Sequence, residues 1–418
     1  MALYLDSLTC DTCSRRFAPG AVELTCPDCG PELGTLTMHY DTERAGRALS
    51  PAVLAERREP SSWRYLEILP LAERPAALHP RVGWTPLYEL PALARTEGVG
   101  RLWLKDDGLN PSASFKDRAS AVGVAHALEL GRRVVTAAST GNAASSVSLF
   151  AACAGLRAVI FVPETAPQAK VAQLLMFGAD VLAVRGTYDQ AFDLCLEAAE
   201  RPGWYCRNTA VNPVLGEGKK TAALEICEQL GFEVPDAVFV SVGDGCIIGG
   251  LWKGFCDAQA MGWIDRRPRI YGVQAEGSAP LVHAFERGDR RVTPEPAATC
   301  ADSICVGQPR DHIKALRAVR ESGGAMLAVP DAAILDAMRR LARQGGVFAE
   351  PAGAAGFAGL HRAREAGLVG ADERVVCLVT GNGLKDVATA IRAVERSPVG
   401  IDPDPAAVAA WVEGGGDT

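Results

Sequence analysis

Short apolar segments of strand length alternate along most of the chain with alanine-rich segments of helix length. The apolar segments contain few polar positions, which is typical of parallel strands covered on both faces. The alanine-rich segments, such as 119–130 and 144–154, predict the covering helices. The pattern therefore predicts an α/β protein with two open, twisted domains and a ligand cleft at the carboxyl ends of the strands. The expected strands are Val134–Ala138, Ala158–Val162 and Asp180–Val184 in one series, and Ala237–Val242, Ile270–Gln274 and Val375–Val379 in the other.

The composition narrows the class of protein. Of the 418 residues, 48% are hydrophobic and 22% are charged, as in an ordinary soluble enzyme with a large core. The net charge of −7 gives no basic surface, so we expect no nucleic acid partner. No apolar run is long enough to span a bilayer, and the first residues lack a signal-peptide pattern. We therefore expect no membrane association and a cytoplasmic location.

Four of the thirteen cysteines form two closely spaced pairs, and the other nine are scattered singly. The pairs are Cys10 with Cys13 and Cys26 with Cys29. Two such pairs, twelve residues apart, can close four thiolates around a structural Zn²⁺ ion. A catalytic zinc ion is disfavoured, because four protein ligands leave no position for water or substrate. Empty or redox-active cysteines are the alternative. With a closing strand within 33–40, residues 1–45 are expected to form a small zinc ribbon.

Lys116 follows a Pro/Ser turn and opens an alanine-rich helical segment. Partial burial and the positive end of a helix lower the pKa of an amine, which suits it for nucleophilic and proton-transfer chemistry. Schiff-base chemistry with an aldehyde cofactor requires such an amine, so Lys116 is the candidate covalent anchor of pyridoxal phosphate (PLP). A lysine in a loop is more often a surface charge, and the companion loops decide between the two interpretations.

Three loops that follow expected strands contain the remaining candidate chemistry. Residues 139–143 combine hydroxyls, an amide and a helix start, which favour a carboxylate. Residues 242–250 are rich in glycine and lead into a helix, which is typical of a phosphate cradle. Residues 380–386 close the last strand. Taken alone, each loop is also compatible with an ordinary capped turn. Glu350, in a separate loop, is interpreted as a helix N-terminal charge in preference to a substrate-side carboxylate.

The segment SASFKDR around Lys116, the loop STGN at 139–142 and the loop TGNGLKD at 380–386 resemble the motifs of the threonine synthase family. The family belongs to the fold-type II PLP enzymes, and the resemblance runs from the cysteines to about Val394. It implies the tryptophan synthase β-like fold and a PLP-dependent lyase acting on an L-amino acid. It also implies that Lys116 binds the cofactor and removes the substrate α-proton.

The resemblance implies a role for each loop. Ser139 and Thr140 would hold the substrate α-carboxylate, and Asn142 would bond the ring oxygen of PLP. Thr380 would face the pyridine nitrogen, where a neutral hydroxyl does not keep the ring protonated and so suits elimination over transamination. The cofactor phosphate would bind the main chain at Gly243, Asp244, Gly245, Cys246 and Ile247.

The chain departs from the family pattern where the substrate phosphate would bind. The family has a serine and an arginine at the positions of Ala210 and Leu215, and polar residues at those of Ala143 and Ile247. Loss of the arginine removes a charge-assisted contact of about 1.5–3 kcal/mol. Lys219, where a glutamine is usual, is the candidate replacement cation for substrate binding.

Three functions therefore remain open. The reaction that the resemblance implies converts O-phospho-L-homoserine to L-threonine, by elimination of phosphate at Cγ and addition of water at Cβ. The alternative within the enzyme class is a paralogue that performs β-elimination or β-replacement on another L-amino acid. The alternative of another class is a non-catalytic PLP-binding protein, although a protein without turnover is not expected to retain every loop of such a site.

The expected domain boundaries follow the same pattern. The oligomeric state stays open, with a homodimer as one arrangement. The expected parts are a zinc ribbon (1–45), the N-terminal part of a large domain (46–108), a small α/β domain with Lys116 and the STGN loop (109–205), the rest of the large α/β domain with the phosphate loop (206–397) and a flexible tail (398–418).

Overall fold

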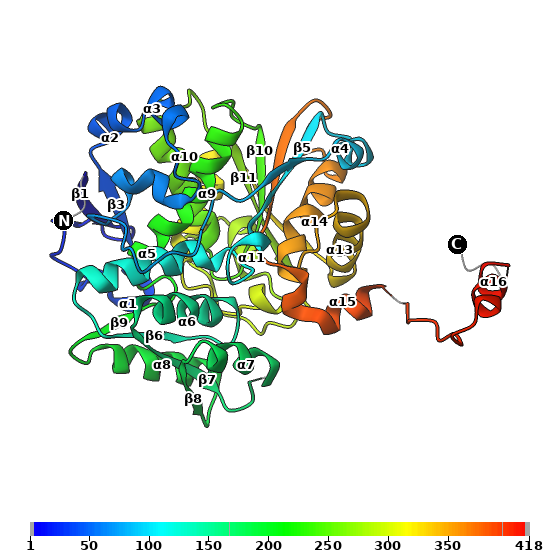
Figure 1. Ribbon diagram of the computed structural model, residues 1–418. Coiled ribbons are helices and arrows are strands. Elements are labelled where there is room, and N and C mark those ends of the chain that lie inside the picture. The colour runs from blue at the N-terminus through cyan, green and yellow to red at the C-terminus, as the bar shows by residue number, and fades with distance from the viewer. Residues whose placement is uncertain (1–3, 167, 395, 414–418) are drawn as a thin grey trace.

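Two mainly parallel β-sheets form the framework of the computed structural model, and a small antiparallel sheet lies near its N-terminus (Figure 1). The structure describes residues 4–166, 168–394 and 396–413. The larger sheet consists of β4 (Leu87–Glu89), β5 (Arg101–Asp106), β10 (Ala237–Ser241), β11 (Arg269–Ala275), β12 (Met326–Val329) and β13 (Arg374–Val379). Its strand order is β12-β11-β10-β13-β5-β4, and only the edge strand β4 pairs in the antiparallel sense.

Helices cover both faces of the larger sheet, which explains why its strands are apolar throughout. Val238 and Val240 of β10 belong to the hydrophobic core on one face, whereas Phe239 belongs to the core on the other. The first face is covered by α9 (Val214–Gln229), α10 (Cys246–Ala260), α11 (Pro280–Glu286) and α12 (His312–Ser322). The second face is covered by α4 (Pro91–Glu97), α13 (Asp331–Gly345) and α14 (Pro351–Glu365).

The smaller sheet is entirely parallel, with the order β8-β7-β6-β9. Its strands are β6 (Val134–Ala138), β7 (Arg157–Pro163), β8 (Asp180–Val184) and β9 (Trp204–Cys206). The helices joined to it are α5 (Lys116–Glu129), α6 (Asn142–Ala154), α7 (Gln168–Met176) and α8 (Tyr188–Ala199). Helix α6 packs on one face through Val147 and Phe150, and α8 packs on the other through Phe192 and Cys195.

The predicted α/β class with two open sheets is confirmed, and all six expected strands are present. The apolar pattern did not predict β4, β9 and β12, which are three, three and four residues long. Strands this short give too few positions for a periodicity signal. The expected domain boundaries remain a proposal, with one detail to note: α2 (Thr42–Ala48) already begins inside the range assigned to the ribbon.

The N-terminal segment folds as three antiparallel strands that face the helices on one side of the larger sheet. Strand β1 (Leu5–Cys10) pairs with β2 (Arg16–Phe17) and with β3 (Leu36–Tyr40), and the short helix α1 (Gly30–Leu33) lies between the last two. Strand β3 occupies the second part of the expected closing strand at 33–40. We call residues 4–40 the ribbon.

The charged segment that follows the ribbon forms α2, α3 (Pro51–Glu56) and the 3-10 helix η1 (Ser62–Ile68). The side chain of Ser61 accepts a hydrogen bond from the Trp63 amide at 3.2 Å, as expected for the predicted helix start. Arg64 donates to both carboxylate oxygens of Glu228 on α9, at 3.0 and 2.5 Å. This buried bidentate pair fixes the segment on the body of the protein.

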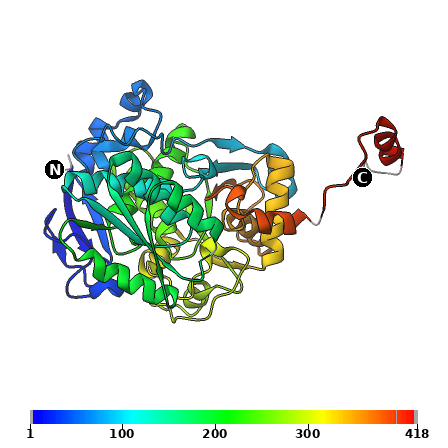
Figure 2. The same cartoon turned by 60° about the horizontal axis from the view of Figure 1, so that its bottom comes forward.

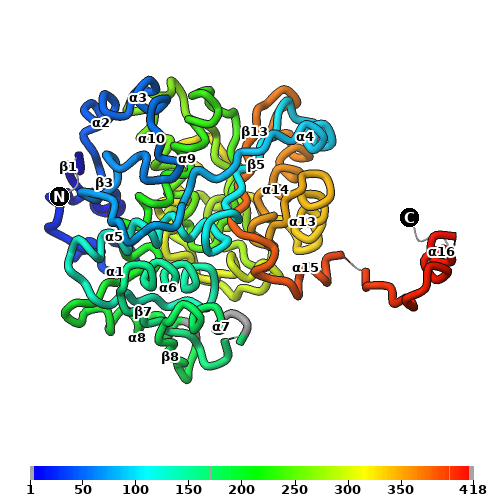
Figure 3. The backbone as a smooth tube through the Cα atoms, in the orientation of Figure 1, coloured from blue at the N-terminus to red at the C-terminus, as the bar shows by residue number. Residues whose placement is uncertain are grey.

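The C-terminal segment leaves the body after η4 (Gly383–Asp386) and α15 (Val387–Val394). Helix α16 (Pro405–Glu413) stands apart from the rest of the chain in two views (Figures 1 and 2) and at the red end of the backbone trace (Figure 3). The expected tail at 398–418 therefore contains a helix, and its residues 414–418 lie outside the described residues. Within the described ranges, no helix is long and apolar enough to cross a membrane.

Candidate active site

A cavity of about 630 Å³ opens where β6, β10 and β13 end, as expected for an open parallel sheet. Its volume lies in the usual range for a site that encloses a cofactor and a small substrate. The cavity brings together every candidate cofactor and substrate residue named from the sequence. These are Lys116, Ser139, Thr140, Asn142, Lys219, Gly243, Asp244, Gly245, Cys246, Ile247 and Thr380.

The loop before Lys116 is held by main-chain bonds to the loop that follows β13. The amide of Phe115 donates to the carbonyl of Thr380 at 2.9 Å, and the amide of Asn382 donates to the carbonyl of Ala113 at 3.0 Å. The same loop also binds the segment before α14, because the Glu350 amide donates to the carbonyl of Gly381 at 3.0 Å. Main-chain hydrogen bonds therefore join three segments that are distant in the sequence next to Lys116.

The residues that flank Lys116 in the sequence are buried and fully engaged. Asp117 accepts from the amide and the hydroxyl of Ser112, at 2.6 and 2.5 Å, which closes the turn. Arg118 is completely buried and donates to both oxygens of Asp107 and both oxygens of Glu225. The SFKDR segment thus fixes the start of α5, so the Lys116 side chain faces the cavity from a rigid position.

The electrostatic surroundings of Lys116 favour its neutral amine. Burial, followed by the positive charge of Arg207, lowers the pKa of Lys116. The carboxylate of Glu350 opposes this shift without reversing it. An amine with a depressed pKa can attack an aldehyde and accept a proton near neutral pH, as predicted from the sequence.

The glycine loop at 243–247 forms a cradle that side chains would fill. Gly245 has φ of +93°, and a Cβ atom there would lie 2.8 Å from the carbonyl oxygen of Asp311. A Cβ atom at Gly243 would lie 3.1 Å from the Cα atom of Ile304. Helix α10 begins within this segment, at Cys246, and the first amides of a helix have no partner within it. The loop therefore directs donors and the positive helix end toward an anion.

Cys246, at the first position of α10, contributes a neutral thiol to this cradle. Burial raises the pKa of Cys246 to about 12, and the negative charge of Asp311 adds to the effect. The sulfur lies 2.9 Å from the hydroxyl of Thr209. A thiol that stays protonated is a poor nucleophile, so the side chain of Cys246 is not suited to covalent chemistry.

The STGN loop joins β6 to α6 and lies on the cavity wall. Ser139 and Thr140 line the cavity directly after the strand, next to the first turn of α6. The side-chain amide of Asn142 donates to the Glu350 carboxylate at 2.9 Å. Glu350 is the N-cap residue of α14, but its side chain makes no cap bond and is buried at the cavity instead. Glu350 thus stands at the start of α14, as the helix-charge interpretation expects, and its carboxylate also lines the cavity.

Two buried cationic side chains, Lys219 and Arg207, line the cavity. Lys219, on α9, is 2% exposed, and its ammonium donates to the carbonyl of Leu215 at 3.3 Å. Burial lowers the pKa of Lys219 to about 8, and the charges of Arg207 and Lys116 contribute to the shift. Leu215 itself packs against α5 beside Gly123. The position of the family arginine is therefore part of the core, and Lys219 lies one turn further along the same helix.

Arg207 is a cavity residue that the sequence analysis missed. It directly follows β9, is 2% exposed, and donates from Nε to the hydroxyl of Ser120 at 3.1 Å. A charged residue at the carboxyl end of a parallel strand is a recognisable signal. It was overlooked because the three-residue strand before it was not predicted.

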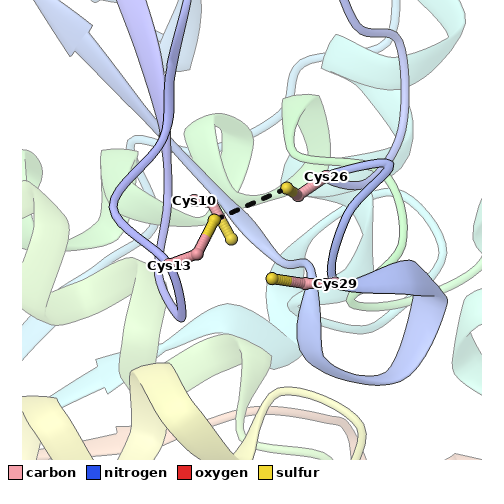
Figure 4. A group of neighbouring side chains, drawn as sticks. All are labelled: Cys10, Cys13, Cys26 and Cys29. Carbon is pink, nitrogen blue, oxygen red and sulfur yellow. Dashed lines mark hydrogen bonds between the residues drawn. The ribbon is translucent and has the colours of Figure 1, made fainter.

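The four paired cysteines converge from two loops of the ribbon (Figure 4). All four sulfur atoms lie within 4.8 Å of one another, and those of Cys13 and Cys26 are 3.8 Å apart. Sulfurs arranged tetrahedrally around Zn²⁺ at about 2.3 Å also lie about 3.8 Å from one another. The spacing of the thiols therefore fits a closed structural zinc site.

Comparison with known proteins agrees with this site. The family model for pyridoxal-phosphate dependent enzymes matches residues 78–381. Threonine synthase of Methanocaldococcus jannaschii is 40% identical over 397 residues, which is 94% of this chain and 96% of the relative. Threonine synthase of Methanosarcina acetivorans is also 40% identical, over 94% of this chain and 95% of the relative. The chain belongs to the threonine synthase family of pyridoxal-phosphate dependent enzymes.

Membership in the threonine synthase family establishes a PLP-dependent lyase of amino-acid metabolism. The alternative of a non-catalytic PLP-binding protein is therefore set aside. Threonine deaminase isoform 2 of Solanum lycopersicum has a similar structure, with a TM-score of 0.64 and 26% identity over 75% of this chain and 88% of that one. The match to L-serine ammonia-lyase of Rhizomucor miehei has a TM-score of 0.65 and 21% identity, and covers 75% of this chain and 98% of that one. This match shows that the two proteins share a fold.

The residues of the cavity fit the family's cofactor. PLP needs an amine for its aldehyde and a cradle of donors for its phosphate. Lys116 would supply the amine, and the loop at 243–247 lies at a helix N-terminus with no free space for a Cβ atom at Gly243 or Gly245. The hydroxyl of Thr380 lies 3.4 Å from that of Ser241, where β13 and β10 both end. The residue expected to face the ring nitrogen, Thr380, therefore carries a neutral hydroxyl and not a carboxylate.

Proposed function

We propose that this enzyme converts O-phospho-L-homoserine to L-threonine with a rearranged site for the substrate phosphate. The observation that supports this reaction is the pair of buried cations Arg207 and Lys219 on the cavity floor. The family arginine is replaced by Leu215, yet the cavity still holds the positive charge that a phosphate leaving group requires. Similarity to threonine synthases along nearly the whole chain supports the same reaction.

Each candidate residue has a task in the proposed reaction. PLP, when bound, supplies an electron-withdrawing ring that stabilises negative charge at the substrate α-carbon. The main chain at 243–247 binds the cofactor phosphate, and Asn142 and Thr380 orient the ring. Ser139 and Thr140 hold the substrate α-carboxylate next to the first turn of α6.

Lys116 moves the proton of the substrate α-carbon. Its lowered pKa increases the fraction of neutral amine that can accept this proton at neutral pH. Lys219 has the opposite requirement, because only its charged form attracts a phosphate dianion. With a pKa of about 8, Lys219 is mostly charged at neutral pH and loses its charge in mildly alkaline solution. The two lysines therefore act in different protonation states in the same cavity.

The four cysteines would hold a structural Zn²⁺ ion in the ribbon. The supporting observation is the convergence of the four sulfurs within 4.8 Å of one another. The four thiolates would fill all four coordination positions of the ion, so the ion would stabilise the ribbon and take no part in turnover.

A second function is favoured by a specific observation. Of the four positions that are polar in the family and apolar here, Ala143 and Ile247 line the cavity, whereas Ala210 and Leu215 are buried beside it. A cavity with fewer polar contacts is suited to a smaller substrate that lacks a phosphate, and the enzyme would then perform β-elimination or β-replacement on another L-amino acid. The likeness to threonine deaminase of Solanum lycopersicum is compatible with this alternative.

Product analysis with a set of substrates tests the two functions. The purified enzyme with PLP is incubated with O-phospho-L-homoserine, O-phospho-L-serine, L-threonine and L-serine, and phosphate, L-threonine, ammonia and keto acid are measured. Release of phosphate and L-threonine from O-phospho-L-homoserine supports the first proposal. Ammonia and keto acid from L-threonine, L-serine or O-phospho-L-serine, with no phosphate release from O-phospho-L-homoserine, would support the second and exclude the first.

The variant Lys219→Gln tests the proposed phosphate site. Loss of a charge-assisted contact of about 1.5–3 kcal/mol predicts a fall of roughly 10- to 150-fold in kcat/KM for O-phospho-L-homoserine. Lys219→Arg is the matched control, because it retains the positive charge and should retain more of the activity. An unchanged kcat/KM in Lys219→Gln would show that Lys219 does not bind the phosphate.

A further inference from the structure

Asp11 lies between two of the zinc-site cysteines, but its side chain points into the protein and is 2% exposed. Within the ribbon, its carboxylate accepts from the hydroxyls of Thr35 and Thr37, at 3.1 and 2.7 Å. From outside the ribbon, Arg317 of α12 donates to it at 2.7 Å, and the ammonium of Lys314 lies 3.7 Å away. One buried carboxylate thus joins the cysteine loop to a helix about three hundred residues later in the sequence.

The same two cations also bind the ribbon strand β3. Lys314 donates to the carbonyl of Leu36 at 2.8 Å, and Arg317 donates to the hydroxyl of Thr37 at 3.2 Å. Helix α12 is therefore held to the ribbon by charge-assisted bonds from consecutive turns. The ribbon and α10 do not close completely on each other, because a hollow of about 520 Å³ is lined by Cys10 and Asp11 on one side and by Gly249 on the other. Beside this hollow, the side chains of Lys314 and Arg317 bridge the ribbon and α12.

The opposite end of this bridge touches the cofactor loop. The amide of Asp311, the N-cap residue of α12, donates to the carbonyl of Asp244 at 2.8 Å. A Cβ atom at Gly245 would lie 2.8 Å from the carbonyl oxygen of Asp311 and 2.9 Å from the Cβ atom of Ala315. At Gly249 it would lie 2.9 Å from the Cβ atom of Lys314. The glycine loop and the first turns of α10 are therefore in direct contact with α12, and a shift of α12 must move the loop.

We propose that Asp11 is a positioning residue for the cofactor-phosphate loop. By holding Arg317 and Lys314, it sets the position of α12, and α12 sets the position of residues 243–247. The ribbon would then contribute to the affinity for PLP, although its cysteines lie outside the cavity. This inference rests on the proposed role of the loop at 243–247, which the experiment tests separately.

The variant Asp11→Asn keeps the shape of the side chain and removes its charge. The dissociation constants of PLP and of pyridoxal, which lacks the phosphate, are measured with apoenzyme by fluorescence titration. Indirect contacts of this kind change binding by roughly 3- to 30-fold. We expect such a rise in the PLP dissociation constant and a much smaller change for pyridoxal. The ratio of the two constants separates displacement of the phosphate loop from a general loss of stability, which would affect both ligands alike.

Asp28→Asn is the matched control, because Asp28 is also an aspartate between two paired cysteines but forms a solvent-exposed ion pair with Arg15. It should leave both dissociation constants and the zinc content unchanged. Arg317→Gln approaches the same contact from α12 and serves if Asp11→Asn does not fold. In the double variant, the rise in the PLP dissociation constant should not exceed that of the larger single change.

Three results would overturn the proposal. The first is an Asp11→Asn variant with a normal zinc content and an unchanged ratio of the two dissociation constants. The second is an equal effect of Asp28→Asn, and the third is full additivity with Arg317→Gln. The loop assignment has its own test in Gly245→Val, which should abolish preference for PLP over pyridoxal. If Gly245→Val still binds PLP in preference to pyridoxal, the assignment of the loop at 243–247 fails. If Gly245→Val loses this preference but Asp11→Asn keeps it unchanged, the loop assignment stands and the link through α12 fails.

Discussion

Arg118, two residues after the cofactor lysine, is the centre of a buried charge cluster whose disruption should be among the most damaging single changes in the protein. Its guanidinium donates to Asp107 at 2.6 and 2.9 Å and to Glu225 at 2.5 and 2.8 Å. Lys105 completes the cluster at 2.7 Å from Glu225, and all four side chains are completely buried. Arg118→Met leaves two buried carboxylates with one cation, which costs about 3–5 kcal/mol. That is a large part of the 5–15 kcal/mol by which native domains are typically stable.

The pKa of Glu225 gives the prediction a pH dependence. Burial alone would raise this pKa, but the charges of Arg118 and Lys105 outweigh burial and lower it to about 2 from the ordinary 4.5. A lowered pKa stabilises the folded state above about pH 4.5, and the stabilisation is lost as the pH falls from 4.5 toward 2. Without Arg118 the pKa of Glu225 should rise, so acid unfolding of Arg118→Met should begin at a higher pH than that of the wild type.

Urea unfolding, followed by circular dichroism at several pH values, measures both effects. Arg157→Met is the control for loss of an ion pair, because Arg157 and Asp180 form a solvent-exposed pair that should contribute less than about 1 kcal/mol. The double variant Arg118→Met/Glu225→Gln removes one charge of each sign and should recover part of the lost stability. The reasoning is refuted if Arg118→Met unfolds within about 1 kcal/mol of the wild type, or if the double variant is less stable than Arg118→Met.

Three further predictions concern the site and the ribbon. Lys116→Ala should lose the visible absorbance of bound PLP after dialysis while keeping its thermal unfolding midpoint, and a variant that retained the absorbance would contradict the covalent role. Because the pKa of Lys219 is about 8 and only its charged form binds phosphate, KM for O-phospho-L-homoserine should rise as the pH increases through 8. This rise, measured from initial rates, should be absent in Lys219→Gln. Cys13→Ser should lower the zinc content determined by atomic emission, and a content equal to that of the wild type would argue against the four-thiolate site.

Much of the site could be predicted from the sequence because its parts are local. Lys116 stands before a helix, and the loops at 139–143 and 243–247 each join a strand to a helix, so their chemistry is written in consecutive residues. The periodicity of apolar segments then predicts parallel strands, and parallel strands bring such loops to one edge of a sheet. The two cysteine pairs are local in the same way, and the distance between their sulfurs followed from the spacing.

Other features depend on contacts between residues that are distant in the sequence. The burial of Arg207 was not predictable, because it follows a strand of three residues that gains its order only by pairing with β6. The Glu350 carboxylate is held at the cavity by its contact with Asn142, which begins helix α6 beside the other parallel sheet. From the sequence, Leu215 was interpreted as replacing an arginine that binds the substrate phosphate. In the structure Leu215 packs against α5 as a core residue, and Lys219 lines the cavity.

The amino-acid order by itself therefore determined the α/β class and singled out the candidate lysine, the glycine-rich turn and the two cysteine pairs, since each is a feature of neighbouring residues. Only the tertiary structure decided which cations reach the cavity, which carboxylate lines it and how the ribbon contacts α12. Burial and Coulomb interactions act through space, so the sign and size of a pKa shift at Lys116 or Lys219 depend on partners that no local pattern identifies.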